Sequence, residues 1–276
     1  MNENTMQKTI AIIGAGNIGC SIAEGLVKSR KYKPGQIILT RKHTELLSAL
    51  GERGFLLSAD NKKAIAKADT IILAVRPAQT DELLQEIGAS LTNEKIVISV
   101  ITDVALNTFY SYISPTVPVI RAMPNIAIAI RESMTCLAAL PEHKAALLEA
   151  VDLFNLLGTT LIIEEQLMVP ATVLGACCVA YFLRAIRAAS QGGIQIGFHA
   201  DDALHIAAQT AKGAAELLLK LNEHPESAID KVTTPRGCTI AGLNEMEHEG
   251  FSASMIKGIL RSFEQAENLY AKHDKH

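Results

Sequence analysis

The stretch Thr9-Ile-Ala-Ile-Ile-Gly14-Ala-Gly16-Asn-Ile-Gly19 decides the fold of this 276-residue chain. An apolar run comes first, then three glycines spaced G-x-G-x-x-G, then an apolar-periodic segment that extends to Arg30. In such a strand–turn–helix the first glycine makes a tight turn and the second lets the backbone approach a pyrophosphate. The third lets helix and strand pack closely. The stretch therefore predicts the phosphate-binding turn of a dinucleotide-binding domain, with a purely structural glycine turn as the alternative.

The chain up to residue 163 alternates short strand-like runs with helix-length segments such as Gln79–Ala89. The runs are continuous in Ile and Val, which is typical of parallel strands covered on both faces. This order predicts a doubly wound α/β domain of the Rossmann type. The expected strands are Thr9–Ile13, Gln36–Thr40, Thr70–Ala74, Lys95–Ser99 and Val117–Arg121, with a last run at Leu161–Ile163.

From Glu164 onward the sequence is helical, with expected breaks at Gly192-Gly193, His224-Pro225 and Thr234–Gly237. We therefore predict two domains, an α/β domain over residues 1–163 and an all-α domain over residues 164–276. The uncharged segment Leu167–Leu183 is close to the length of a membrane span. It is only moderately apolar and lies in mid-chain, so we expect a helix buried on all sides and no membrane contact. The apolar surface of this half favours a homo-oligomer.

Composition excludes several classes of partner. Lys and Arg number 26 against 29 Asp and Glu, so no basic excess exists to neutralise nucleic acid. Five scattered cysteines form no C-x-x-C pair, which argues against a zinc site and favours reduced thiols. The polar residues before Thr9 do not resemble a signal peptide. We expect a cytoplasmic protein without a metal that binds a small molecule.

The dinucleotide type depends on the residues after the second strand. NAD-binding domains usually place an acid there to bind the ribose hydroxyls. Here Thr40-Arg41-Lys42 stands 21 to 23 residues after Gly19. No carboxylate would repel a 2′-phosphate and a guanidinium could bind it bidentately, so we predict NADP(H) in preference to NAD(H). The alternative is that both cations are solvated loop charges.

A second stretch, Leu73-Ala-Val-Arg-Pro77, closes the strand Thr70–Ala74. Ligands of open α/β sheets bind beyond the carboxyl ends of the strands, so this turn should border the cofactor. The predicted cofactor-binding residues are Ile13, Gly14, Gly16, Asn17, Ile18, Gly19, Thr40, Arg41, Ala74, Val75, Arg76 and Pro77.

Six stretches between residues 10 and 242 together resemble the pyrroline-5-carboxylate reductase family, in the family's order. They are the Ile-Gly-Ala-Gly-Asn run ending at Asn17, Leu73–Pro77, Arg121-Ala-Met-Pro-Asn125, Ala208-Gln-Thr210, His224-Pro225 and Asp230-Lys-Val-Thr-Thr-Pro-Arg-Gly-Cys-Thr-Ile-Ala-Gly242. The resemblance implies the NAD(P)H-dependent reduction of 1-pyrroline-5-carboxylate to L-proline, the last step of proline biosynthesis. It also implies an N-terminal Rossmann domain and a C-terminal helical, substrate-binding and dimerisation domain, with active sites built across the dimer.

The chain is similar to a divergent member of that family. Leu174-Gly-Ala-Cys-Cys-Val-Ala-Tyr181 stands where the family usually has Leu-Ser-Gly-Ser-Gly-Pro-Ala-Tyr, and Ile101-Thr-Asp103 stands where it has Ala-Ala-Gly. In the substrate loop Arg236 replaces a glycine and Cys238 a threonine. The exact imine is therefore less determined than the fold.

The segment Thr233–Thr239 offers hydroxyls and a glycine turn before a helix-like run, which suits a substrate carboxylate. Hydride transfer needs an imine nitrogen that is protonated or hydrogen-bonded, and with the resemblance we assign that role to Thr239. The predicted substrate-binding residues are Thr234, Gly237, Cys238 and Thr239. Thr239 could instead be an ordinary helix N-cap. Arg236 could attract the carboxylate or be a tolerated surface residue.

Two other functions stay open. A reductase of another small imine or carbonyl compound, such as a β-hydroxyacid dehydrogenase, would resemble its family in using a lysine on the long helix after the Rossmann domain. No lysine occurs between Lys144 and Lys212. A catalytically silent NADP-binding paralogue would explain the altered segment Leu174–Tyr181. The histidines form no catalytic triad with a serine and an acid, and we expect a structural role for His224.

Overall fold

The computed structural model describes residues 8–273 of the chain. By internal contacts it divides into two compact units. The first comprises the described residues up to Ala176 together with those from Phe263 onward, and the second is Cys177–Ser262. The predicted ranges 1–163 for cofactor binding and 164–276 for substrate binding and dimerisation describe functional domains, and they remain a prediction.

In the described part of the first unit, eight strands form one sheet in the order β3-β2-β1-β4-β5-β6-β7-β8. All neighbouring strands are parallel except β6 and β7. The order reverses between β1 and β4, which is the switch point of a doubly wound sheet. The strands are β1 (Ile10–Ile13), β2 (Ile37–Thr40), β3 (Leu56–Ser58), β4 (Thr70–Leu73), β5 (Ile96–Ser99), β6 (Val119–Met123), β7 (Ser133–Ala139) and β8 (Gly158–Ile162).

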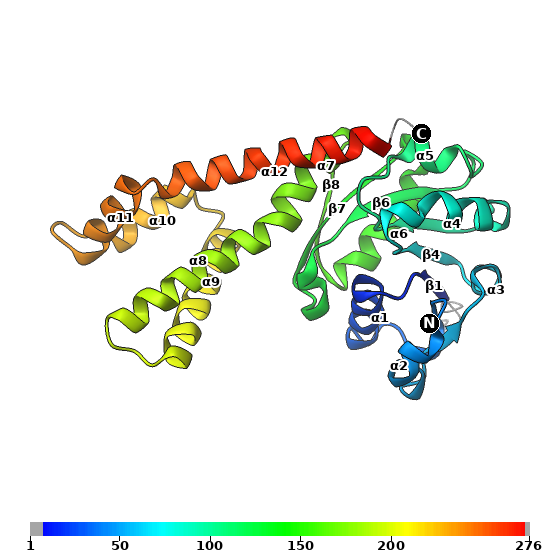
Figure 1. The fold of residues 1–276 in the computed structure, drawn as a ribbon, viewed down its shortest axis with the longest axis horizontal. Coiled ribbons are helices and arrows are strands. Elements are labelled where there is room, and N and C mark those ends of the chain that lie inside the picture. Colours follow the sequence, from blue (N-terminus) through cyan, green and yellow to red (C-terminus); the bar gives the residue numbers. More distant parts are fainter. Residues whose placement is uncertain (1–7, 274–276) are drawn as a thin grey trace, which may run out of the picture. The chain divides into compact units, whose positions relative to one another are not determined.

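Helices cover both faces of this sheet (Figure 1). Successive strand side chains point to opposite faces, so Ile10 and Ile12 join one core with α1 and α6, whereas Ile13 joins the other with α3, α4 and α5. Two-sided burial is why the strands read as continuous apolar runs. The helices are α1 (Asn17–Lys28), α2 (Ser48–Glu52), α3 (Asn61–Ala66), α4 (Thr80–Ile87), α5 (Leu106–Tyr110) and α6 (Lys144–Asn155).

The predicted strands all exist, each within a few residues of its expected bounds, and the doubly wound α/β fold class is confirmed. Two further strands, β3 and β7, were not predicted. β3 has only three residues, and β7 reads Ser-Met-Thr-Cys-Leu-Ala-Ala, which lacks the run of Val and Ile that marks the others. β7 is a strand because tertiary packing buries it.

The second unit is helical. It begins at Cys177, the last residue of a π-helix, and ends within α12 (Phe251–His273) at Ser262. Between these points lie α8 (Cys178–Gln195), α9 (Ala200–Leu221), α10 (Pro225–Val232) and α11 (Cys238–His248). His224 caps α10, since its Nδ1 accepts a hydrogen bond from the Glu226 backbone N–H at 3.3 Å. The break at His224-Pro225 and the loop before α11 are confirmed.

One expected break is wrong, because α8 (Cys178–Gln195) continues through Gly192 and Gly193. A Cβ on Gly193 would lie 3.0 Å from the Cβ of Ala203 on α9. Gly193 therefore lets α9 approach α8 closely, and its role is packing rather than helix termination.

The expectation that Leu167–Leu183 is buried, largely between subunits, stays a prediction, because within the single chain one side of the segment is exposed. The segment is helical, through α7 (Met168–Ala171), a π-helix (Thr172–Cys177) and the start of α8. However, Leu174 is 66% exposed and Phe182 is 62% exposed, because no other element of the described chain covers that side. In the described residues, the helix Glu165–Gln195 is long and apolar enough to cross a membrane by length and composition, with 17% of its most apolar window buried. Length and composition alone are weak evidence for a span.

Candidate active site

The glycine turn is held between the ends of two strands. The Ala15 backbone N–H donates to the Thr40 carbonyl at 2.8 Å, and Ala74 donates to the Ile13 carbonyl at 2.8 Å. Gly14 has a φ of 94°, and a Cβ there would lie 2.7 Å from Val75 Cγ1. Only glycine tolerates both that backbone conformation and that contact. The structure thus brings the turns after β1, β2 and β4 together at one edge of the sheet.

The second and third glycines meet different surroundings. A Cβ on Gly19 would lie 2.7 Å from the Gly14 carbonyl oxygen, so this glycine permits close packing of α1 on the turn. A Cβ on Gly16 would meet nothing within 4 Å. Gly16 is the N-cap of α1, with no side-chain cap and no acidic residue in the first turn. The space beside Gly16 and the positive end of the helix dipole suit an approaching pyrophosphate.

Arg41 lies beside this turn. Its Nη1 donates a hydrogen bond to the Ala15 carbonyl at 3.3 Å, and the residue as a whole is exposed. Cys20 Sγ contacts the same carbonyl at 3.5 Å. Burial raises the pKa of the Cys20 thiol, and the nearby Arg41 charge opposes that rise. The guanidinium is therefore held at the turn while remaining accessible to a ligand.

Asn61 belongs to this site and was missed from the sequence. Its Oδ1 accepts a hydrogen bond from Thr40 Oγ1 at 2.7 Å, and its Nδ2 donates to Glu86 at 3.1 Å. The preceding Asp60 caps α3 by accepting from the Lys63 backbone N–H, which together with the Lys63 side chain lowers the pKa of Asp60. A helix N-cap directly after a strand was the available signal, but β3 was too short to be recognised.

The turn after β4 completes this group. Pro77 opens the 3₁₀ turn Pro77–Gln79, and Arg76 Nε contacts Gln79 Oε1 at 3.4 Å. Ala74 and Val75 flank Gly14, as the glycine contacts above show. All twelve predicted cofactor residues therefore lie on the glycine turn, the first turn of α1 or the ends of β1, β2 and β4.

The predicted substrate residues lie together in one loop of the second unit. The Gly237 backbone N–H donates to the Thr234 carbonyl at 2.9 Å, and a Cβ on Gly237 would lie 2.5 Å from Thr234 Oγ1. Gly237 is the N-cap of α11, so Thr239 stands within the first turn and is not the cap. Thr234, Cys238 and Thr239 are exposed. Arg236 has a φ of 60°, a conformation that favours the glycine expected at this position.

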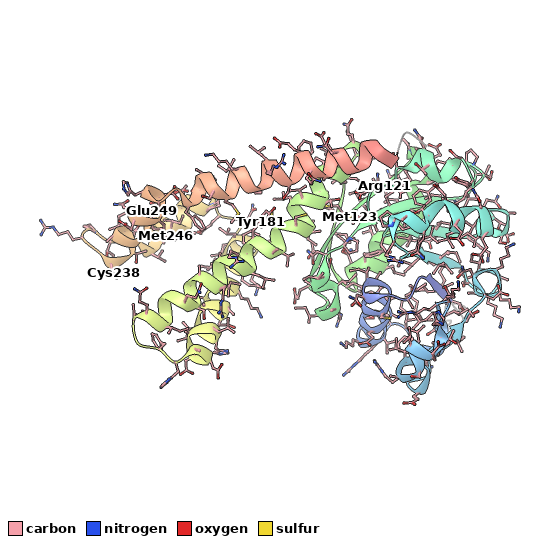
Figure 2. The ribbon with its side chains drawn as sticks, in the orientation of Figure 1. Arg121, Met123, Tyr181, Cys238, Met246 and Glu249 are labelled. Carbon is pink, nitrogen blue, oxygen red and sulfur yellow. The ribbon has the colours of Figure 1, made fainter. Side chains whose placement is uncertain are left out.

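The altered segment Leu174–Tyr181 ends in the first turn of α8 and keeps a tyrosine with a clear role. Tyr181 hydrogen-bonds through its hydroxyl with Ser262 Oγ, and it contacts the Gly258 carbonyl at 3.4 Å. Both partners are on α12, so Tyr181 of α8 ties the two helices together within the second unit (Figure 2).

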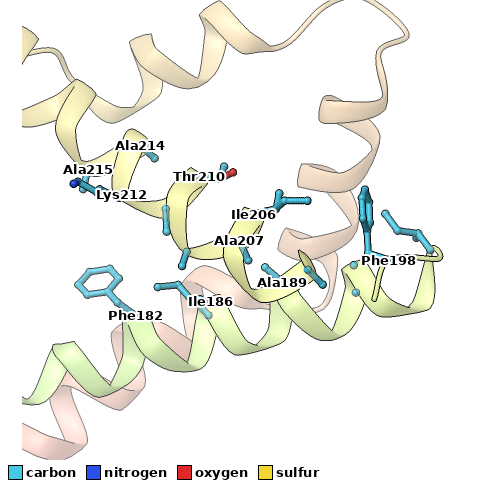
Figure 3. Close-up of a pocket in the computed structure, with 17 residues that line it drawn as sticks. Phe182, Ile186, Ala189, Phe198, Ile206, Ala207, Thr210, Lys212, Ala214 and Ala215 are labelled. Carbon is cyan, nitrogen blue, oxygen red and sulfur yellow. The ribbon is translucent and has the colours of Figure 1, made fainter. Parts of the chain in front are cut away.

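A large apolar groove lies between α8 and α9 (Figure 3). Its volume is about 1030 Å³ and its lining includes Phe182, Ile186, Phe198 and Ile206. Polar groups contribute little to the lining, so the groove suits an apolar partner rather than a charged substrate. Among residues 8–273, no cluster of three or more His, Cys, Asp or Glu could hold a metal ion.

A doubly wound parallel sheet with a glycine turn at its switch point, followed by a helical unit, defines the class of two-part dinucleotide-binding oxidoreductases. Comparison with known proteins narrows this class. The family described as "NADP oxidoreductase coenzyme F420-dependent" matches residues 9–103. The family described as "Pyrroline-5-carboxylate reductase dimerisation" matches residues 165–269.

Whole proteins agree with these matches. The chain is 46% identical to pyrroline-5-carboxylate reductase 2 of Dictyostelium discoideum, over 97% of this chain and 95% of that protein. It is 48% identical to pyrroline-5-carboxylate reductase 1 of the same organism over 95% of this chain, which spans only 50% of that longer protein. The solved pyrroline-5-carboxylate reductase of Coxiella burnetii matches with a TM-score of 0.87 at 25% identity, covering 95% of this chain and 98% of that one. The chain belongs to the pyrroline-5-carboxylate reductase family.

Proposed function

We propose that this chain reduces 1-pyrroline-5-carboxylate to L-proline, the last step of proline biosynthesis, in the cytoplasm. The observation that supports this most is that one chain of this family holds both an open dinucleotide turn at Gly16 and an exposed hydroxyl loop at Thr234–Thr239. The family's relatives bear the name of this activity.

A nicotinamide dinucleotide fits the first unit. The N–H groups at the start of α1 would hold the pyrophosphate, because no side chain caps the helix and no acid in the first turn repels the phosphates. The Thr40–Asn61 pair is suited to the ribose beside the turn, because it presents a hydroxyl and an amide. When bound, the reduced nicotinamide supplies the hydride for the imine carbon.

We assign the preference for NADP(H) over NAD(H) to Arg41. Its guanidinium is held at the turn by the Ala15 carbonyl, and its remaining N–H groups could bind a 2′-phosphate. Lys42 is exposed beside it and adds charge of the same sign. No acidic side chain follows β2 directly to oppose a phosphate.

The substrate loop would bind and activate the imine. Thr234 and the N–H groups at the start of α11 would hold the carboxylate, since Gly237 as N-cap leaves those N–H groups without a side-chain partner. Thr239 would hydrogen-bond the ring nitrogen or its attached water. Because Thr239 is not the helix cap, its hydroxyl has no capping role to fulfil.

We further propose that the chain acts as a homodimer, or as a larger assembly of dimers, in which a second copy covers the apolar surface of α8 and α9. Phe182, Leu183 and Ile206 are exposed large apolar side chains of α8 and α9, and Phe182 and Ile206 also line the apolar groove between these helices. Clustered apolar side chains of this kind mark protein–protein interfaces. Neither nucleic acid nor a membrane has a part in this proposal.

The test is a turnover assay with purified protein, NADPH and pyrroline-5-carboxylate, followed by quantification of both products. We expect one proline for each NADPH oxidised. Turnover of another small imine alone would show a different substrate. NADPH binding without any turnover would show a silent paralogue and contradict the proposal.

A further inference from the structure

The motif Arg121-Ala-Met-Pro-Asn125 has no part in the function proposed above, yet it lies where β6 reaches the carboxyl edge of the sheet. β4, β5 and β6 are parallel neighbours, so their carboxyl ends share that edge. In doubly wound sheets the half beyond the switch point receives the nicotinamide end of a dinucleotide. Figure 2 labels Arg121 and Met123 on β6.

Arg121 holds the start of the long helix. Its side chain is 5% exposed, and its Nη1 lies 3.1 Å from Glu165 Oε1. The same Glu165 oxygen accepts a hydrogen bond from the Leu106 backbone N–H at 2.6 Å. Beside this ion pair, Met123 packs with the fully buried Met168 of α7. The start of the helix is therefore fixed to β6 by both polar and apolar contacts.

Asn125 holds the irregular part of the same helix. Its Nδ2 donates to the Gly175 carbonyl at 2.9 Å, within the π-helix Thr172–Cys177. Its Oδ1 accepts from the Ala127 backbone N–H at 2.9 Å, and its own backbone N–H donates to Ser133 Oγ at 3.0 Å. Asn125 is 8% exposed, and both the nitrogen and the oxygen of its buried side-chain amide are hydrogen-bonded.

A π-helical turn disrupts the regular backbone hydrogen bonds of an α-helix, and such turns are frequent at functional sites. Here the side chain that satisfies a carbonyl of the turn comes from the end of β6, 50 residues away in the sequence. The turn therefore lies at the carboxyl ends of the strands, where the nicotinamide end of the cofactor would lie. It also includes the first residues of the segment Leu174–Tyr181, in which this chain departs from its family's pattern.

We propose that Arg121 and Asn125 are positioning residues for hydride transfer, which fix the π-helical turn as a wall beside the nicotinamide end of the cofactor site. The inference rests on the proposed function, because it concerns the same reaction. Neither residue touches the reacting atoms. They act through the backbone around Glu165 and Gly175.

The test is Asn125→Asp, a nearly isosteric change that keeps the acceptor for Ala127 but removes the donor to Gly175. We expect kcat to fall about 10- to 100-fold, because a displacement of about 1 Å of a positioning group can cost as much as 100-fold in rate. The primary isotope effect, measured with NADPH that carries deuterium at both C4 positions, should rise because hydride transfer becomes rate-limiting. The Kd for NADPH should stay within about threefold, because the glycine turn is untouched.

The matched control is Thr172→Val. Thr172 Oγ1 donates a hydrogen bond to the Met168 carbonyl at 2.8 Å. This bond lies within the same helical segment and does not link the segment to β6, so its loss should leave the position of the π-helical turn unchanged. This variant should keep the wild-type kcat and isotope effect. An Asn125→Asp variant that melts at a lower temperature but shows the wild-type kcat and isotope effect would overturn the proposal.

A second variant covers the case in which Asn125→Asp does not fold. Glu165→Gln keeps an acceptor for Leu106 on a side chain that is 32% exposed, but removes the charge facing Arg121. It should lower kcat and raise the isotope effect in the same way, and a wild-type isotope effect would overturn the proposal. A wild-type chain that reduces no pyrroline-5-carboxylate would instead refute the proposed function and remove the ground for this inference with it.

Discussion

Gly16→Ala separates cofactor binding from folding more sharply than any other change in the glycine turn. The new Cβ would meet no atom within 4 Å, and the φ of −89° and ψ of −160° are accessible to alanine. Alanine is a poorer N-cap than glycine, but it also restricts the unfolded chain, and these effects oppose each other at about 0.5–1 kcal/mol each. The free energy of unfolding should therefore change by no more than about 1 kcal/mol.

The same Cβ would stand where the pyrophosphate approaches. Losing one charge-assisted hydrogen bond costs about 1.5–3 kcal/mol, which corresponds to a rise in Kd of about 10- to 150-fold. Titration of NADPH fluorescence measures the Kd, and thermal unfolding measures stability. Gly19→Ala is the contrasting control, because its Cβ would collide with the Gly14 carbonyl oxygen at 2.7 Å and should destabilise the fold. A folded Gly16→Ala protein with the wild-type Kd for NADPH would refute the reasoning.

Three further predictions concern the cofactor, the chemistry and the assembly. Arg41→Asp should shift the cofactor preference from NADPH towards NADH. Equal Kd values for both cofactors in the wild type would show that Arg41 does not bind the 2′-phosphate of NADPH. Thr239→Val should lower kcat and kcat/KM together by about 10- to 100-fold, whereas Thr234→Ala should mainly raise KM. Normal turnover in Thr239→Val would exclude the catalytic role. Phe182→Glu places a charge on the apolar groove of α8 and should yield monomers by light scattering, and a wild-type monomer would contradict the proposed interface.

The sheet could be predicted from the sequence where local pattern and tertiary burial agree. β1, β2, β4 and β5 are short runs of Ile, Val and Leu, and each is buried in the interior of the sheet. β7 is buried along most of its length, but it contains no Val or Ile and two of its seven residues are Ala, so its sequence carries a weak strand preference and its position depends on the neighbouring strands. For the long helix the sequence predicts burial, but the structure of a single chain leaves one face exposed. Only a structure of the dimer would show whether a second copy covers that face.

The site divides in the same way. The glycine turn could be predicted because its residues are contiguous and each glycine has a local steric reason. The contacts of Asn61, Arg121 and Asn125 could not, because their partners lie 21, 44 and 50 residues away along the chain. Hydrogen bonds over such separations leave no periodicity in the sequence, although Arg121 and Asn125 were already marked by the family resemblance.

The most direct test of the central claim is to follow the hydride itself. The purified protein is incubated with pyrroline-5-carboxylate and NADPH that carries deuterium at both C4 positions, and the product is analysed by mass spectrometry. Transfer to the imine carbon predicts L-proline that carries a single deuterium at that carbon. Absence of proline, or proline without the label, would contradict the assignment of this chain as a reductase of that imine.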